Sequence, residues 1–502
     1  MRGGHTRLIA FMGWGLTALL AGCAPVGPAY QPPRPELPAA WSGAGEGGTA
    51  NAGPVALETW WTLFDDPRLD SLIQRAVAAN PDLKIAVARI QQARAQYRTA
   101  TAALAPAVDV SGTYAGTRSS ENAGGSNAGT TQELYQAGFD SGWELDIFGG
   151  ARRSVEAAGA RLAATAEDRR DVLVSLEAEV ARNYLELRGS QQRLRAAREN
   201  VGIQERTLYL ARGRQESGLG NRLEVAQAET QLALTRAQLP PLENSAGASI
   251  YSLSLLLGLP PRSLEKELAP GAPLPARPAW LPETLPSDLL RRRPDIRRAE
   301  RQLAAATADI GVATAELFPR FSLTGLLGLQ SVSLGDLVSA GSRYWTVGPT
   351  VSWPLFDAGR ARANIDFNRG RREEAQASYE KTVLVALGEV EFALLGLSRE
   401  TETYHSLADA VRSGQRAEEL ASGRYRAGIS DILSLLQSQT ALYLSQDQLI
   451  QSEQRLALYQ VALFKALGGG WEIDRDESNI SSRPSAKALV DLQPIPTGDV
   501  IQ

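Results

Sequence analysis

Apolar and polar residues alternate with a period of two in two parts of the chain. In residues 135–147 and 344–355 apolar side chains fall largely on every second position, and similar segments start at Val108 and at Phe321. A period of two is typical of a strand with one apolar and one polar face. The pattern therefore predicts two β-hairpins, with strands of about the length that crosses a bilayer.

Long helices are predicted after each hairpin. No proline occurs in residues 107–239 or 355–483, and a continuous helix over residues 152–216 would be about 100 Å long. Such a rod has to pack laterally on similar rods, as in coiled coils. Apolar residues recur at heptad spacing at Val383, Leu387, Val390, Leu394 and Leu397, and 210 positions earlier at Leu173, Val180, Tyr184 and Leu187, with Glu177 as the exception.

The chain contains an internal repeat. GRQESGLGNRLEVAQAET (213–230) and GRYRAGISDILSLLQSQT (423–440) share six residues at an offset of 210, namely Gly213/Gly423, Arg214/Arg424, Gly218/Gly428, Leu223/Leu433, Gln227/Gln437 and Thr230/Thr440. Such self-similarity predicts two homologous halves. Gly218 and Gly428 lie where one long helix should end and the next begin, a position that favours glycine. Each copy therefore predicts the tip of a helical hairpin.

The repeat divides the chain into successive segments. Each half has a helical stretch (69–103 or 287–316) that ends before a proline, then a hairpin, then long helices. The predicted division is a signal peptide (1–22), a lipid-anchored extended segment (23–59), a first repeat (60–258, with its hairpin at 107–148 and helices at 151–258), a linker (259–282), a second repeat (283–468, with its hairpin at 320–356 and helices at 361–468) and an equatorial C-terminal tail (469–502).

The N-terminus resembles the export signal of a bacterial lipoprotein. Arg2 and Arg7 precede an apolar run over residues 8–20, which is typical of a signal peptide and too short to span a bilayer securely. The run ends in LAGC, which resembles a lipobox and implies that Cys23 becomes the acylated, palmitate-bearing first residue. Ala24 in place of aspartate implies sorting to the outer membrane. The alternative is a buried cysteine after an ordinary signal.

Composition argues against several classes of function. The net charge is −4 with both signs interspersed, so no basic surface for nucleic acid is indicated. Beyond residue 22 the chain has one Cys, one His and no Met. Without CxxC or HExxH motifs we expect no catalytic, cofactor or metal site, and no enzyme. His405 is expected to be a partly exposed helix residue.

Four amphipathic strands cannot close a barrel within one chain. An open sheet edge cannot face lipid, since each unpaired backbone group there costs several kcal/mol. A homotrimer would supply twelve strands, an even number that suits a membrane barrel. The apolar faces of the strands would then contact lipid, and the polar faces would line a lumen.

Four longer motifs make the chain similar to a known family. They are RRRPDIRRAERQLAAATADIGVATAELFPRFSLTG (291–325), SWPLFDAGR (352–360), YRAGISDILSLLQSQTALY (425–443) and LFKALGGGW (463–471). These motifs resemble the outer-membrane factor family of TolC-like efflux and secretion channels, and in particular its lipoprotein branch, which serves drug pumps of the resistance-nodulation-division (RND) type.

The resemblance implies a mainly α-helical fold with a membrane β-barrel. A homotrimer would form a twelve-stranded barrel, with four strands from each chain, continuous with a long α-helical barrel that crosses the periplasm. The protein would lie in the outer membrane as a passive conduit for drugs or other small molecules. Its partners would be outer-membrane lipid, a periplasmic adaptor (membrane-fusion) protein and an inner-membrane pump of the RND type.

The resemblance also places a periplasmic gate at the hairpin tips that turn at Gly218 and Gly428. Asp431 and Glu224 are the candidates for an acidic ring, because like charges repeated by threefold symmetry focus a field inside a narrow pore. Tyr425 and Arg424 are candidates for bonds between helices that hold the tip closed. The family's usual carboxylates are missing at Ser434 and Gln437, and its occasional basic residue is missing at Ser430. The alternative is that the acidic candidates are merely solvated.

The returning helix of the first repeat is expected to differ from that of the second. Pro240 and Pro241 predict a break in the returning helix of the first repeat, with no counterpart near Leu449.

Within the channel class, the chain could serve type I secretion or the efflux of metals or organic solvents. A pore-free periplasmic coiled-coil scaffold would explain the helices but leave the two-sided strands without a role. A surface lipoprotein enzyme would lack a nucleophile with its base.

Overall fold

The computed structural model describes residues 25–42, 57–278 and 285–472. They fall into two compact units. Among the described residues, the first unit consists of residues 25–37, 82–171 and 294–385, and the second consists of residues 38–42, 57–81, 172–278, 285–293 and 386–472. Each unit combines parts of both repeats, because long helices pack side by side and not into a separate core for each repeat. The predicted signal peptide, Cys23 and most of the C-terminal tail lie outside the described residues.

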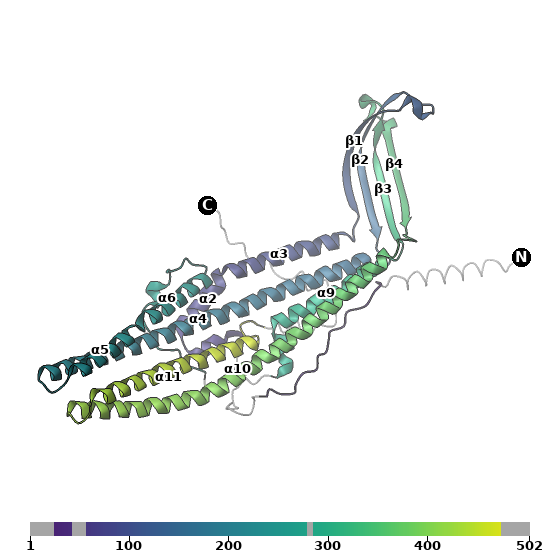
Figure 1. Ribbon diagram of the computed structural model, residues 1–502. Coiled ribbons are helices and arrows are strands. Elements are labelled where there is room, and N and C mark those ends of the chain that lie inside the picture. Colours follow the sequence, from purple (N-terminus) through teal and green to yellow (C-terminus); the bar gives the residue numbers. More distant parts are fainter. Residues whose placement is uncertain (1–24, 43–56, 279–284, 473–502) are drawn as a thin grey trace. The chain divides into compact units, whose positions relative to one another are not determined.

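The first unit contains one antiparallel sheet of four strands in the order β1-β2-β3-β4 (Figure 1). The four predicted strands are all present. Residues 107–145 form the first hairpin and residues 320–352 form the second, with the strands β1 (Ala107–Arg118), β2 (Thr131–Leu145), β3 (Arg320–Ser331) and β4 (Arg343–Ser352).

The strand register places the apolar residues on one face of the sheet. Val110 pairs with Phe139, Phe139 with Leu327, and Leu327 with Trp345, so one apolar row crosses all four strands. The ends of this row are 77% (Val110) and 74% (Trp345) exposed in the single chain. On the opposite face Gln136 lies between Thr113 and Gln330, two residues of the same polar character. Within the described chain, β1 and β4 each pair on one side only.

Ion pairs join two of the helices of the first unit. These helices are α3 (Pro81–Ala102), α9 (Pro294–Ala315) and the first parts of α4 (Gly150–Glu216) and α10 (Arg360–Arg426). Arg297 bonds Glu167 at 2.8 Å, and Arg298 bonds Asp168 at 2.7 Å. The RRRPDIRRAER motif therefore supplies the arginines that fasten α9 to α4.

The helical stretches before the hairpins are each divided in two, where one continuous stretch was predicted. α2 (Pro67–Ala79) ends before α3, and α8 (Leu289–Arg292) ends before α9. Asn80 and Arg293 between them have extended ψ angles of 129° and 118°. The residue before a proline avoids the helical region, so Pro81 and Pro294 each start a new helix.

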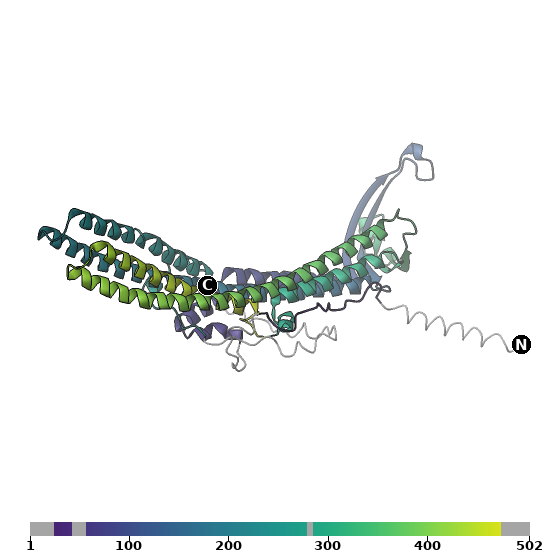
Figure 2. The ribbon, with the colours of Figure 1, turned by 60° about the horizontal axis from the view of Figure 1, so that its bottom comes forward.

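Two helical hairpins dominate the second unit (Figures 1 and 2). α4 turns into α5 (Arg222–Arg236), and α10 turns into α11 (Ile432–Ala466). The predicted break at Pro240 and Pro241 is confirmed, because α5 ends at Arg236 and α6 (Leu239–Leu256) starts with these prolines in its first turn, whereas α11 is continuous. The shorter elements of this unit are α2, α8, η1 (Leu57–Phe64), α7 (Glu265–Leu268) and η3 (Pro286–Asp288).

Three consecutive glycines follow α11 and pack closely on the second unit. A Cβ atom at Gly468 would lie 2.9 Å from the carbonyl oxygen of Arg292, and one at Gly470 would collide with the carboxyl group of Glu177. Trp471 then donates its indole N–H to the Arg292 carbonyl oxygen at 3.1 Å. Glu177 is 3% exposed. The glycines of the LFKALGGGW motif therefore let the backbone lie directly against α4.

No helix within the described ranges has an apolar stretch long enough to cross a membrane.

Candidate gate at the helical hairpin tips

The two hairpin tips have the same backbone geometry. Gly218 and Gly428 have φ angles of 73° and 75°, in the left-handed region that glycine favours. The next residue in each turn donates its amide to the carbonyl oxygen five positions earlier, Leu219 to Arg214 at 2.8 Å and Ile429 to Arg424 at 2.9 Å. This arrangement ends a helix and satisfies one of its last carbonyl groups.

A side-chain cap starts each returning helix. The Asn221 side chain accepts from the Glu224 amide at 3.0 Å, and the Asp431 carboxylate accepts from the amide of Ser434 at 3.2 Å and from its hydroxyl at 3.1 Å. Such a cap contributes about 1 kcal/mol to helix stability. Asp431 is nevertheless exposed. Its charge therefore stabilises α11 and also remains at the surface of the tip.

Tyr425 links the two hairpins. Its side chain is 1% exposed, and its hydroxyl donates to the Glu224 carboxylate at 3.2 Å. Burial and the negative charge of Glu224 raise the pKa of the Tyr425 hydroxyl to about 12. The phenol therefore stays protonated near neutral pH and keeps its donor.

Arg214 completes this contact. Its guanidinium carbon lies 4.9 Å from the centroid of the Tyr425 ring, a favourable cation–π distance. One terminal nitrogen donates to the Tyr425 carbonyl oxygen at 3.1 Å, and the other donates to that of Leu219 at 3.3 Å. We call Arg214, Glu224 and Tyr425 the tip clamp, since together they bond both turns.

Sequence reasoning named Arg424 as the basic partner, and the structure puts its repeat counterpart Arg214 beside Tyr425. Arg424 is exposed, and within the described ranges its side chain has no hydrogen bond or ion pair. The two arginines occupy equivalent positions of the repeat, so the motif offered both. Only the packing of one hairpin on the other distinguishes them.

A small apolar core lies behind the tip clamp. It joins residues of all four hairpin helices, which are Leu208, Ala211, Ala228, Leu232, Tyr425, Ile432, Leu435 and Leu436. Farther along the helices, Tyr443 donates its hydroxyl to Gln238 at 2.7 Å. The tips are therefore packed as one body and are not independent loops.

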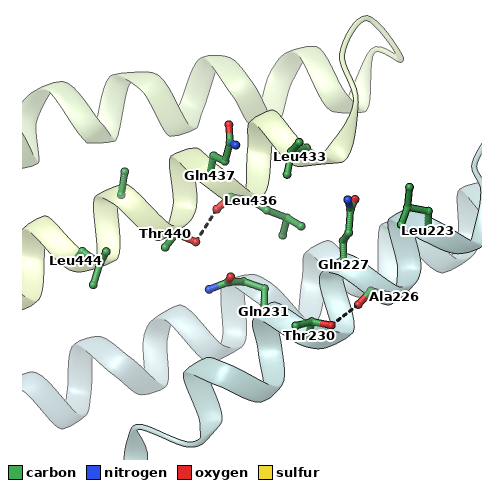
Figure 3. Close-up of a pocket in the computed structure, with 11 residues that line it drawn as sticks. Leu223, Ala226, Gln227, Thr230, Gln231, Leu433, Leu436, Gln437, Thr440 and Leu444 are labelled. Carbon is green, nitrogen blue, oxygen red and sulfur yellow. Dashed lines mark hydrogen bonds between the residues drawn. The ribbon is translucent and has the colours of Figure 1, made fainter.

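An open groove of about 650 Å³ lies between α5 and α11 (Figure 3). The repeat-related pairs Leu223/Leu433, Gln227/Gln437 and Thr230/Thr440 line it from opposite sides, together with Ala226, Gln231, Leu436, Ala441 and Leu444. No charged side chain lines the groove. Of the six repeated residues, three build the turns or the helix ends before them, and the other three face each other across this groove.

Comparison with known proteins identifies the family. The model of the outer membrane efflux protein family matches residues 72–259 and 285–469, one match for each repeat. The chain is 36% identical to the pyoverdine export outer membrane protein OpmQ of Pseudomonas aeruginosa, over 84% of this chain and 89% of that protein. It is 34% identical to the probable efflux pump outer membrane protein TtgC of Pseudomonas putida, over 92% of this chain and 95% of that protein.

Solved structures agree. The outer-membrane channel OprN matches with a TM-score of 0.84 and 36% identity, over 89% of this chain and all of that one. The open-state MtrE outer membrane channel of Neisseria gonorrhoeae matches with a TM-score of 0.80 and 29% identity, over 90% of this chain and 99% of that one. The predicted fold class is confirmed, with the trimeric barrel taken from these homologues. The family consists of channel proteins that work with adaptor proteins and inner-membrane pumps. Matching over both repeats, the chain belongs to the outer membrane efflux protein family of TolC-like channels.

Proposed function

We propose that three copies of this chain form a passive conduit that exports drugs or other small molecules and opens at its hairpin tips. The chain acts as a channel and not as an enzyme. This is supported by its family, which is made up of channel proteins. The tip clamp is the main observation that supports a gate at the tips, because it bonds the α10–α11 hairpin to the α4–α5 hairpin. Separating these helices requires breaking it.

The sheet supports closure by neighbouring chains. β1 and β4 lie at the two ends of the sheet, and the apolar row across all four strands is exposed in the single chain. Three sheets joined edge to edge pair both ends and turn the apolar rows toward lipid. The polar rows then face the lumen.

The tip clamp is strong enough to hold a gate closed and weak enough to be opened by a partner. A hydrogen bond to a charged group contributes about 1.5–3 kcal/mol, and a partly exposed cation–π contact about 1 kcal/mol. Three copies of the clamp around a trimer multiply this cost. Asp431, with its exposed carboxylate, supplies the acidic ring, while Glu224 is engaged by Tyr425.

The tips are also the docking surface for the periplasmic adaptor, which connects the channel to an inner-membrane pump of the RND type. Leu219 and Ile429 are exposed in the two turns, and the groove between α5 and α11 has no charged lining residue. Exposed apolar side chains of this kind favour a protein partner. Mild cross-linking in cells followed by mass spectrometry tests this: a membrane-fusion protein linked through the tips is expected, and cross-links confined to residues outside the tips would contradict it.

Cys23 carries the lipid anchor that holds the protein at the outer membrane. The lipobox-like sequence LAGC supports this, and acyl chains anchor a protein by burying many CH₂ groups. Mass spectrometry of the mature N-terminus is expected to find acylated Cys23, and an unmodified cysteine would exclude the anchor.

Conductance of the purified trimer in planar lipid bilayers tests the gate. Tyr425→Phe removes only the hydroxyl that bonds Glu224, so we expect the open probability to rise by about tenfold or more. Tyr209→Phe is the matched control, since Tyr209 lies on α4 in the same unit and is 79% exposed. Equal open probabilities of the two variants would rule out the clamp, and a protein that never conducts would rule out the channel.

A further inference from the structure

Arg188 on α4 is a buried cation that pairs with no carboxylate in the described part of the chain. Its side chain is 0% exposed. One terminal nitrogen, Nη1, donates to the side-chain oxygen of Gln191 at 2.7 Å and to the carbonyl oxygen of Pro270 at 3.1 Å. Across the described residues, Nε and Nη2 have no hydrogen-bond partner. A buried charge with unused donors is costly, so an acceptor at these two nitrogens would be favourable.

The carboxylates closest to hand are occupied by other donors. Asp66 caps α2, where it accepts from two backbone amides, and it also accepts from the Tyr184 hydroxyl at 2.7 Å. Both oxygens of Glu267 accept from Arg75 at 3.0 Å. The Tyr184 ring lies 4.9 Å from the guanidinium carbon of Arg188 and gives a cation–π contact. Arg188 is therefore held in place by neutral groups, which leave its charge unbalanced.

Arg188 lines a pocket of about 470 Å³ in the second unit. The pocket lies among the start of α2, α4 and residues 267–272, and its polar lining residues are Asp66, Arg68, Ser71, Tyr184, Arg188 and Glu267. Its volume is in the range of small-molecule sites. The lining side chains carry two positive and two negative charges, and Arg75, bonded to Glu267, adds a third positive charge. A monoanion would balance this excess of one positive charge.

The free edge of Arg188 matches a carboxylate. Nε and Nη2 direct two parallel N–H groups from one edge of the planar guanidinium, at the spacing of the two oxygens of a carboxylate. Asp66 and Glu267 line the same pocket and disfavour a dianion such as sulfate. We propose that this pocket binds a small-molecule carboxylate, with Arg188 as its bidentate donor.

The pocket is reached from the N-terminal end of α2. Arg68 and Ser71 are exposed there, whereas Nε and Nη2 of Arg188 are closed to solvent, so binding requires a shift of lining side chains. The bound carboxylate bridges α2, α4 and the stretch after α7. Gln191 already fastens that stretch to α4 by donating to the Leu268 carbonyl oxygen at 2.7 Å. The anion therefore stabilises the link between the two repeats on the long helix of the first.

Acetate titrated into the purified trimer in lipid nanodiscs tests the site, with binding followed by broadening of the ¹³C carboxylate signal of labelled acetate. We expect saturable binding at pH 7, and slower hydrogen exchange of residues 265–272 at saturating acetate. Neutral acetamide should leave this exchange unchanged, and sulfate should bind more weakly than acetate. A trimer without saturable acetate binding would overturn the inference, and tighter binding of sulfate would overturn the assignment to a carboxylate.

Substitution of Arg188 locates the binding. Arg188→Lys keeps the charge but removes the planar fork, so the affinity for acetate should fall by about tenfold or more. Arg198→Lys is the matched control, because Arg198 lies on the same helix, outside the pocket lining, and pairs with Glu243 at 2.7 Å. This control should bind acetate as the wild type does, and an equal affinity of both variants would overturn the inference.

A second pair of variants leaves Arg188 in place and decides the matter even if Arg188→Lys does not fold. Ser71→Glu puts a competing carboxylate at the pocket, so it should also lower the affinity for acetate by about tenfold or more. Gln74→Glu adds the same charge to α2 at an exposed position outside the pocket lining and should leave the affinity unchanged. Equal affinities of these two variants would contradict a carboxylate site at Arg188.

Discussion

Replacing Glu177 by glutamine measures how strongly one buried carboxyl group destabilises the fold. Glu177 lies on α4 at a position where the heptad pattern has apolar residues, and its side chain is 3% exposed. Within the described residues, its Oε2 atom has no hydrogen-bond partner. Burial, with no compensating charge, raises the pKa of this carboxyl from an ordinary 4.5 to about 9.

The raised pKa sets both the size and the sign of the effect. Between pH 4.5 and 9 the folded chain holds a proton at Glu177 that the unfolded chain has released. Folding stability therefore falls with rising pH across this window, by about 1.4 kcal/mol for each pH unit. By pH 7 the accumulated loss is about 3 kcal/mol. Glu177→Gln keeps the shape and carries no charge, so it should regain about this amount at pH 7 and nothing below pH 4.5.

Chemical unfolding of the trimer in detergent at pH 5, 7 and 8.5 gives the comparison. The midpoint difference between Glu177→Gln and the wild type should widen steadily with pH. Glu179→Gln is the matched control, because Glu179 is on the same helix, partly exposed, and paired with Arg182 at 2.6 Å; its effect should stay below about 1 kcal/mol. A difference that is constant over the three pH values would refute the reasoning, since a buried neutral carboxyl cannot lack pH dependence.

Two further pairs of variants test the tips and the sheet. Gly428→Ala should destabilise the second tip by about 1 kcal/mol because φ is 75° there, whereas Gly423→Ala, inside α10 with no atom close to the new methyl group, should stabilise by about 0.5–1 kcal/mol. Hydrogen exchange at the tip checks both signs, and equal signs would contradict the turn geometry. Val110→Lys, on the apolar face, should lower trimer stability in lipid by about 2–4 kcal/mol. Gln136→Lys, on the polar face, should be tolerated. If urea unfolding showed that Gln136→Lys destabilises the trimer more than Val110→Lys does, the assignment of the apolar and polar faces would be wrong.

Local patterns in the sequence predicted the elements of this fold well. The period of two located the four strands, and the repeat located both tips, because backbone conformation at Gly218 and Gly428 depends on the glycine itself. The division of the two helical stretches at Pro81 and Pro294 was not predicted, although a proline disfavours a helical conformation at the residue before it. The two compact units could not be predicted, because they depend on which stretches of long helix pack side by side.

Residues whose roles depend on packing were harder to predict. Glu177 stood out as an exception to the heptad pattern, but its contact with Gly470 lies almost 300 positions away in the sequence. Residues 25–30 were predicted only as part of an extended segment, and nothing in the sequence marked Arg153 as the side chain that bonds Val26 and Gly27. Arg214 was equivalent to Arg424 in the repeat, so only the structure separates them.

The tip clamp is asymmetric, because the two repeats supply different residues to it. The residues shared by both copies build the turns, the ends of the helices before them and the groove. The clamp residues Tyr425 and Glu224 are not shared, since their counterparts 210 positions away are Gln215 and Ser434. A clamp of the same kind therefore cannot form with the two hairpins exchanged. A trimer has six tips but only three clamps, each within one chain, so the interface between the two hairpins of one chain differs from the interface between hairpins of neighbouring chains.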